Sequence, residues 1–186
     1  MRKVHSFNVT GSKLYVSIVG VKGVKVDDIN KTLITLDELA NGTIYQLFDA
    51  DYIAGPNHIY HATANALHAM NNGYNISSTL SIETLLYAAC NNQINKAIKI
   101  LGVSKWTYNV AVTVFSETKN DPLTLKIAES LGEIDDTVLD LTREKYGQLK
   151  DLFDITEESI GAVGKEPYDA LTGLITEKGA LIGLRR

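Results

Sequence analysis

Three of the four histidines in this 186-residue chain lie in the stretch HIYHATANALHAM, which runs from His58 to Met70. Histidine changes charge near neutral pH and is a common metal ligand, so this stretch is the first candidate for a chemical site. On a helix, the three histidines would share one polar face with Asn65 and Asn72. The opposite face would carry the apolar residues Ile59, Ala62, Ala66, Leu67 and Met70.

The geometry of that helix disfavours a metal site. Zinc enzymes commonly use histidines at i and i+4 together with a carboxylate or a distant histidine. Here the spacings are three and seven, the helix has no carboxylate, and His58 and His68 would lie about 15 Å apart along its axis. We therefore expect no metal, no cofactor and no catalytic residue. The first interpretation is a solvated polar face, and the second is a stripe that stacks on or hydrogen-bonds a ligand.

Charge is unevenly distributed along the chain. The net charge of −4 argues against strong nucleic-acid binding. Residues 52–115, however, carry Lys96, Lys99 and Lys105 against Glu83 alone, whereas residues 116–186 carry nine basic and fifteen acidic residues. Any contact with an anion is therefore expected in the middle segment.

Cys90 is the single cysteine, which excludes an internal disulfide framework and a cysteine-based zinc cluster. It follows the apolar run LLYAA and is expected to be a buried structural thiol rather than a nucleophile. The N-terminal residues do not resemble a signal peptide, and no apolar run approaches the roughly 20 residues of a membrane span. We expect a cytoplasmic protein with no membrane partner.

Hydrophobic periodicity predicts the elements. Strands are expected at 4–9, 14–21, 43–53, 108–115 and 180–184, and helices at 56–72, 78–90, 92–102, 120–132, 142–153 and 166–179. A capping box at Thr35–Glu38 predicts a short helix that stops at Asn41 and Gly42. The first two strands look like a hairpin, although strands and helices otherwise alternate. We therefore expect an α/β (α+β) fold, one domain over residues 1–186 with a mixed β-sheet flanked by helices.

Two of these helices carry more detailed expectations. In the helix at 92–102, one side should be buried and should carry Ile94, Ala97, Ile98 and Leu101. Lys96 and Lys99 would then face outward. The helix at 120–132 should begin with Asp121 as N-cap and Pro122 as its first residue.

Four segments together resemble a known family. In order they are HIYHATANAL, NISSTLSIETLLYAACNNQINKAIKILGV, LGEIDDTVLDL and KGALIGL. They are similar to the small tRNA-binding accessory subunit of the KEOPS complex, the PRPK-binding protein family, in an archaeal form. The resemblance covers roughly residues 44–186. It implies a mixed α/β domain without catalysis of its own.

The resemblance also implies partners. The family docks on the amino-terminal lobe of the KEOPS protein kinase and grips the single-stranded CCA end of tRNA. The complex makes N6-threonylcarbamoyladenosine next to the anticodon, and another subunit performs the transfer. Contacts with the other KEOPS subunits would be indirect.

Site residues are assigned by combining this expectation with the chemistry of single-stranded RNA, which is held by backbone electrostatics and base stacking. Positive charge would come from Lys96, Lys99 and Lys105. His58, Tyr60 and His61 would stack on bases. Asn92 and Gln93 would read base edges.

The kinase surface is predicted in the segment FDITEESIGAVG, residues 153–164, which shows little regular periodicity. A short, loop-rich segment rarely buries many large side chains internally, so they are candidates for an interface core. They are Phe153, Ile155, Ile160 and Val163. The alternative is that they cover a sheet edge. The acidic character of residues 116–186 would help to steer a basic partner.

Two departures from the family pattern keep other functions open. The family often has a glycine and an arginine before QI, where this chain has Cys90, Asn91 and Asn92. It often has basic residues before the histidine helix, where Pro56 and Asn57 stand here. Both changes remove positive charge where RNA would pass. The alternatives are a kinase-binding regulatory subunit without RNA affinity and a histidine-based metal-dependent enzyme.

Overall fold

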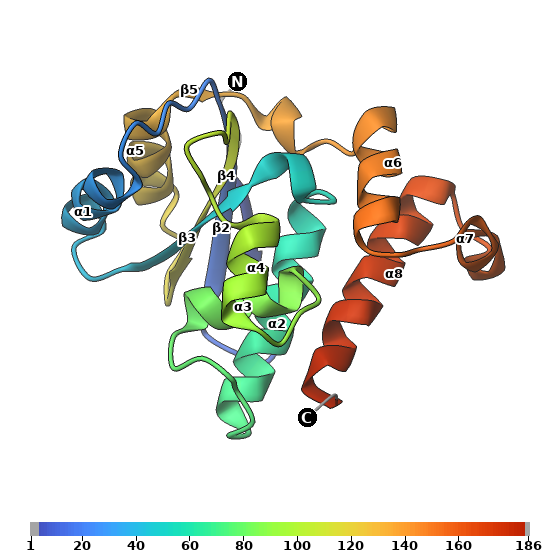
Figure 1. Ribbon diagram of the computed structural model, residues 1–186. Coiled ribbons are helices and arrows are strands. Elements are labelled where there is room, and N and C mark those ends of the chain that lie inside the picture. Colours follow the sequence, from blue (N-terminus) through green and yellow to red (C-terminus); the bar gives the residue numbers. More distant parts are fainter. Residues whose placement is uncertain (1–3, 185–186) are drawn as a thin grey trace. The chain divides into compact units, whose positions relative to one another are not determined.

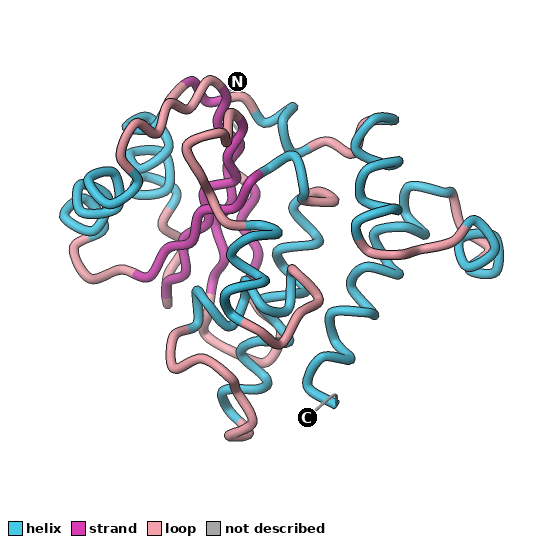
Figure 2. The backbone as a smooth tube through the Cα atoms, in the orientation of Figure 1, coloured by secondary structure: helices cyan, strands magenta, loops and turns pink. Residues whose placement is uncertain are grey.

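The structure is a computed structural model that describes residues 4–184, and its chain divides into two compact units (Figure 1). The sheet unit comprises residues 1–51 and 102–139, and the helical unit comprises residues 52–101 and 140–186. All strands of the described chain belong to the sheet unit. Figure 2 shows these strands in magenta. The predicted combination of helices and strands is confirmed. The expectation of one domain over residues 1–186 stays a prediction.

The sheet unit is built around two long strands, β2 (Tyr15–Lys22) and β4 (Asn109–Ser116). The strand order is β1 (His5–Asn8), β2, β4 and β3 (Ile44–Asp49). The short β5 (Glu133–Ile134) pairs with the end of β2. The two long strands each bury six consecutive residues, rich in valine, which explains their strength as a strand signal in the sequence.

Every pairing among the described strands is antiparallel, so the prediction of a mixed sheet is wrong. That prediction assumed that two strands joined by a long, helix-rich connection would run parallel to each other. The connection from β3 to β4 is long, yet it delivers β4 beside β3 in the opposite direction. Connection length excludes a hairpin but does not set strand direction.

Helices α1 (Ile29–Ala40) and α5 (Asp121–Leu131) pack on one face of this sheet. Alternate residues of the long strands, among them Val19 and Val112, form a cluster with Leu36 and Ile127. The segment that leads into η2 (Asp136–Leu139) lies close to β2. A side chain on Gly20 of that strand would lie 2.6 Å from the Asp135 carbonyl oxygen. A glycine is therefore required in the middle of that strand.

Helix α1 begins earlier than the capping box predicted. Its N-cap is Asp28, whose carboxylate accepts hydrogen bonds from the backbone N–H groups of Asn30 and Lys31. Thr35 lies inside the helix, where its hydroxyl donates to the Lys31 carbonyl. An aspartate is as good an N-cap as a threonine, so the helix begins at Asp28, upstream of the predicted N-cap Thr35. The predicted end at Asn41 is confirmed, with that residue in the left-handed conformation.

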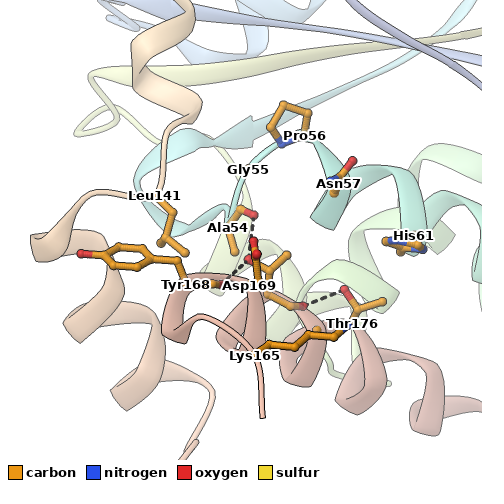
Figure 3. Close-up of a pocket in the computed structure, with 12 residues that line it drawn as sticks. Ala54, Gly55, Pro56, Asn57, His61, Leu141, Lys165, Tyr168, Asp169 and Thr176 are labelled. Atoms are coloured by element: carbon orange, nitrogen blue, oxygen red, sulfur yellow. Dashed lines mark hydrogen bonds between the residues drawn. The ribbon is translucent and has the colours of Figure 1, made fainter. Parts of the chain in front are cut away.

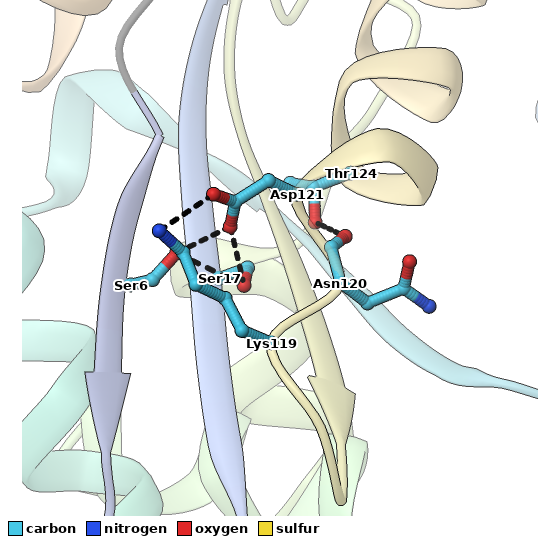
Figure 4. A network of polar contacts seen from close by, with 6 residues as sticks. All are labelled: Ser6, Ser17, Lys119, Asn120, Asp121 and Thr124. Carbon is cyan, nitrogen blue, oxygen red and sulfur yellow. Dashed lines mark hydrogen bonds and ion pairs between the residues drawn. The ribbon is translucent and has the colours of Figure 1, made fainter.

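The start of α5 is also shifted by one residue, because Asn120 is its N-cap. Asp121 instead joins the helix to the β1–β2 hairpin, as Figure 4 shows. Its carboxylate accepts a hydrogen bond of 2.6 Å from the Ser6 hydroxyl and pairs with the Lys119 ammonium at 2.8 Å. Ser17, which is fully buried, completes the cluster. Burial opposes ionisation of Asp121, but these partners prevail and lower its pKa.

The helical unit contains α2 (Pro56–Asn71), α3 (Leu80–Ala88), α4 (Ile94–Leu101), α6 (Arg143–Leu152), α7 (Glu157–Val163) and α8 (Pro167–Ala180). A core cluster of this unit contains Leu149, Phe153, Leu171 and Ile175. The prediction for the buried side of α4 is confirmed for Ala97 and Leu101, which are buried. It is wrong for Ile94 and Ile98, which are exposed.

The end of the described chain differs from the predicted strand at 180–184. Helix α8 runs to Ala180 and continues as a 3-10 turn, η3 (Leu181–Leu184). A five-residue apolar run does not distinguish a strand from a buried helical turn. The last turn of α8 packs closely on α3, because a side chain on Gly179 would lie 2.5 Å from the Tyr87 carbonyl oxygen.

The contact at Gly179 predicts a sharp difference between two glycines of one helix. Gly179→Ala should lower the free energy of unfolding by about 1–3 kcal/mol, because the added methyl group would collide with backbone. Gly173→Ala is the matched control, since that position is exposed with no atom in the way, and it should raise the free energy by up to about 1 kcal/mol. Urea unfolding measures both. Equal effects would show that the helices are not in close contact.

Candidate functional site

The structure separates the three histidines that the sequence placed on one face of α2. His61 and His68 are exposed, but His58 is only 1% exposed, so the prediction of a solvent-facing His58 is wrong. Both of its ring nitrogens are bonded. Nδ1 lies 3.2 Å from the Ala54 backbone N–H group, and Nε2 lies 3.0 Å from the Ala88 carbonyl oxygen.

These two partners fix the protonation of His58. The backbone N–H of Ala54 can only donate, so Nδ1 accepts, and the carbonyl of Ala88 can only accept, so Nε2 carries the proton. The ring is therefore neutral. Burial lowers its pKa to about 4, the hydrogen bond to Ala88 opposes that shift, and the positive charges of His61 and Lys145 reinforce it.

The position of His58 makes it a structural residue. The ring also lies edge-on to Phe153, with centroids 5.9 Å apart. Its contacts connect the segment before α2, the end of α3 and the segment after α6. It therefore offers no free face on which a base could stack.

The other predicted aromatic residues of α2 do reach the surface. Tyr60 and His61 form an edge-to-face pair with centroids 5.1 Å apart. His61 also lines a cleft of about 600 Å³ within the helical unit, between the start of α2 and one side of α8 (Figure 3). Asn57, Lys165, Tyr168 and Asp169 line the same cleft. Nothing in the sequence relates residues 165–169 to His61, so this grouping depends on the fold.

The predicted RNA residues after α3 form a second group. Asn92, Gln93 and Lys96 line a small cavity of about 150 Å³, together with Cys90, Asn91 and Ile182. Cys90 has a left-handed backbone (φ 51°), and Asn91 accepts a hydrogen bond from the Gln93 backbone N–H. This turn presents amides and an ammonium group together. Lys99 is exposed one turn further along α4.

Lys105 belongs to the other unit. It lies in the loop before β4, and its ammonium nitrogen is 4.7 Å from the centre of the Trp106 ring. Trp106 is 82% exposed. Sequence reasoning did not single out this tryptophan, although its position between Lys105 and Tyr108 in a loop was a usable signal.

The predicted kinase-binding residues lie mostly inside the helical unit. Phe153 and Ile160 are buried, and Ile155 packs against the same core cluster as Phe153. Val163 is 37% exposed. The expectation of a loop-rich segment is also wrong, because Thr156 accepts a hydrogen bond from the Ser159 backbone N–H and starts α7. A helix buries one face, so α7 accommodates Ile160 without a partner, whereas Ile155 lies before the helix and is half-buried against the core cluster.

Two further features, metal ligation and membrane crossing, concern the described part of the chain. Among residues 4–184, no three histidine, cysteine, aspartate or glutamate side chains come together in a way that could hold a metal ion. No helix in that range has the length and apolar character needed to cross a membrane.

Comparison with known proteins gives two matches. A family model described as "Kinase binding protein CGI-121" matches residues 24–179. The "Regulatory protein Cgi121" of Methanocaldococcus jannaschii is 29% identical to the chain over 167 residues. That alignment covers 89% of this chain and 98% of the relative. Both units contribute to the matched range, which begins after β2 and ends in the last turn of α8.

The buried imidazole predicts how stability depends on pH. The folded-state pKa of about 4 lies below the ordinary value of 6.5, so the unfolded chain binds a proton that the folded chain rejects. This contribution is fully present above pH 6.5 and is lost as pH falls toward 4, with a slope of up to about 1.4 kcal/mol per pH unit.

Urea unfolding between these pH values should reveal the slope. His58→Gln should be less stable than the wild type at neutral pH but should lack this part of the slope, so the two curves converge in acid. His68→Asn is the matched control, because this exposed histidine of the same helix is not among the groups that shift the His58 pKa and its loss should leave the slope intact. An unchanged slope in His58→Gln would contradict the assignment.

Proposed function

Because the chain belongs to the CGI-121 family of kinase-binding proteins, we propose that it is the accessory subunit of a KEOPS complex, binding both the KEOPS kinase and the 3′ CCA end of tRNA. In this role it is not a catalyst. It supports the synthesis of N6-threonylcarbamoyladenosine in the cytoplasm and meets the remaining KEOPS subunits through the kinase. The single observation that carries the proposal is the family match over residues 24–179.

The kinase surface that we propose is the exposed side of α6, α7 and α8. Since Phe153, Ile155 and Ile160 support that surface from inside, the contacts themselves would come from exposed apolar side chains. These are Leu152, Val163 and Tyr168. Tyr168 lies 5.0 Å from Tyr146, ring centre to ring centre, which gives the surface an aromatic centre of the kind that anchors protein interfaces.

Charge supports the same surface. Glu157, Glu158, Glu166 and Asp169 are exposed on α7 and around the start of α8. A rim of carboxylates around apolar contacts would accelerate association with a basic patch on the kinase. Lys150 is paired with Glu157 at 2.6 Å, so part of this charge is neutralised locally.

The RNA surface that we propose is centred on the turn between α3 and α4. Asn92 and Gln93 would read base edges there, and Lys96 would contact a phosphate, because all three line one cavity. Lys99 would extend the positive charge along α4. Tyr60, which is half-buried, and His61, which is exposed, supply an edge-to-face pair elsewhere in the same unit, with which an unstacked base could pack.

A second candidate function is kinase binding without RNA affinity. The observation that favours it is the modest charge of the RNA surface, where Asn91 and Asn92 stand in place of basic residues. Binding of tRNA by the isolated subunit separates the two functions.

Binding to tRNA should be weak and should require the 3′ end. Lys96→Glu should abolish the difference between tRNA with CCA and tRNA without it, because the substitution places a carboxylate beside the phosphates. Lys126→Glu, on the exposed side of α5, is the matched control and should leave the difference intact. Fluorescence anisotropy measures both. Absence of binding to either tRNA would favour the second candidate function, whereas equal affinity of the wild-type protein for the two tRNAs would remove the 3′-end role.

Kinase binding should depend on the exposed side of α7. Val163→Glu should weaken it by roughly tenfold or more, because a charge would have to be desolvated in an apolar interface. Ile34→Glu is the matched control, since Ile34 is exposed on α1 in the sheet unit. Calorimetric titration with the purified kinase, with circular dichroism as a check on folding, is the measurement. Wild-type affinity in folded Val163→Glu would place the kinase surface elsewhere.

A further inference from the structure

The loop before β4 presents the most exposed large hydrophobic side chain of residues 4–184, Trp106 at 82%. Tyr108, two residues later, is also exposed. Large aromatic side chains are rarely left in water without a reason, since each would gain free energy from burial. Neither the kinase surface nor the RNA surface proposed above uses these two rings.

The loop is firmly held, so the exposure of Trp106 is not a consequence of local disorder. The Thr107 backbone N–H donates to the Ser104 carbonyl, and the Ser104 N–H donates to the Thr107 hydroxyl at 3.0 Å. That hydroxyl donates to the Asp49 carboxylate at 2.9 Å, which connects the turn to the end of β3. Thr107 is buried while its neighbours point outward. A ring presented by a fixed turn loses little conformational entropy on binding.

Basic residues surround the two rings. The ammonium group of Lys105 lies over the Trp106 ring at 4.7 Å. The strand end with exposed Lys22 and Lys25 lies alongside Tyr108, because the Val24 N–H donates to the Tyr108 carbonyl and a side chain on Gly23 would touch the Tyr108 ring. This patch, called the Trp106 patch below, consists of Lys22, Lys25, Lys105, Trp106 and Tyr108.

Two carboxylates near the Trp106 patch, Asp49 and Asp51, accept hydrogen bonds from groups outside it. Asp49 accepts from Thr107, and Asp51 accepts from the Asn109 amide at 2.8 Å. Glu133 lies opposite Lys22 in the β2–β5 register, and the Asp135 carboxylate also interacts with the Lys22 charge, so the charge of Lys22 is offset whereas Lys25 and Lys105 remain. The chemistry left at the surface is two aromatic faces bordered by ammonium groups.

We propose that the Trp106 patch is a second RNA contact, in which Trp106 stacks on an unpaired base and Lys105 meets the adjacent phosphate. Single-stranded RNA combines these two features at the spacing of one nucleotide, whereas a protein partner would bury the rings among apolar groups. The inference rests on the proposed RNA function but extends it. The Trp106 patch belongs to the sheet unit, the 3′-end residues belong to the helical unit, and stacking here does not require CCA.

The chain provides its own probe, because Trp106 is its single tryptophan. Addition of an oligoadenylate of about 12 nucleotides, within the range bound by single-strand-binding folds, should quench the tryptophan fluorescence in a saturable way. The midpoint should match the dissociation constant from anisotropy with a labelled oligoadenylate. The same strand annealed to oligouridylate should quench much less, because its bases are already stacked.

Substitutions then test each part of the Trp106 patch. Trp106→Ala should weaken oligoadenylate binding roughly 5- to 100-fold, and Trp106→Phe should retain most of the affinity. Lys105→Gln should reduce the slope of log affinity against log salt by about 0.7, the value for one phosphate on a single strand. Ile34→Ala removes another exposed apolar side chain of the sheet unit and should change nothing. Circular dichroism verifies that each variant is folded.

The outcomes separate this inference from the proposed function. If removal of CCA has no effect on wild-type binding but Trp106→Ala still weakens it, the 3′-end role fails and the Trp106 patch stands. If the affinity requires CCA and Trp106→Ala is neutral, the 3′-end role stands and the inference is overturned. Binding of oligoadenylate without a change in fluorescence also overturns it. So does a Trp106→Ala protein that loses affinity for the kinase but not for RNA.

Discussion

The helical unit is organised around one buried imidazole. A polar ring inside a protein must have both nitrogens satisfied, and His58 meets this requirement only while the Ala54 N–H and the Ala88 carbonyl lie on opposite sides of it. Its two neighbouring segments are also the ones that carry the candidate surfaces. Residues 54–57 form one wall of the larger cleft, and the turn after Ala88 leads directly into the cavity lined by Asn92 and Gln93. A residue predicted to touch a ligand thus positions the residues that would do so.

In the sheet unit, polar contacts at the strand ends likewise hold neighbouring segments together. Asp121 joins the start of α5 to the hairpin, and Asp49 holds the turn that presents Trp106. These carboxylates accept hydrogen bonds from hydroxyl and backbone N–H groups of their own unit, and Asp121 also pairs with an ammonium group. The ends of the strands are therefore fixed by side chains while the middle of the sheet is held by apolar packing, an arrangement that leaves the loops free to differ in chemistry.

The sequence predicted elements with strong local signals and missed features that depend on tertiary partners. Helix α2 and strand β4 were found because their periodic patterns are long. His58 was misplaced because the helical wheel assigns a face by angle alone, whereas its partners at Ala54 and Ala88 are brought together by folding. Ile94 and Ile98 were taken as buried, yet α4 is only eight residues long and its packing covers little more than Ala97 and Leu101. The RNA residues were grouped by their chemistry together with the resemblance, and the kinase residues by the irregular spacing of their segment. Only folding shows that Asn92 and Lys96 share a cavity while Phe153 lies in a core.

The position of β4 has a consequence for how the protein is made. This strand lies between β2 and β3, yet the ribosome delivers it only after α2, α3 and α4. Until then β3 lacks its strand partner and β2 is paired only with β1. More than fifty further residues must be synthesised after β3 before β4 can pair with both strands. At about 5–20 residues per second this interval lasts several seconds, long compared with the closure of a hairpin. Sheet formation is thus non-local and late, and β2 and β3 both lack the strand that lies between them during that interval.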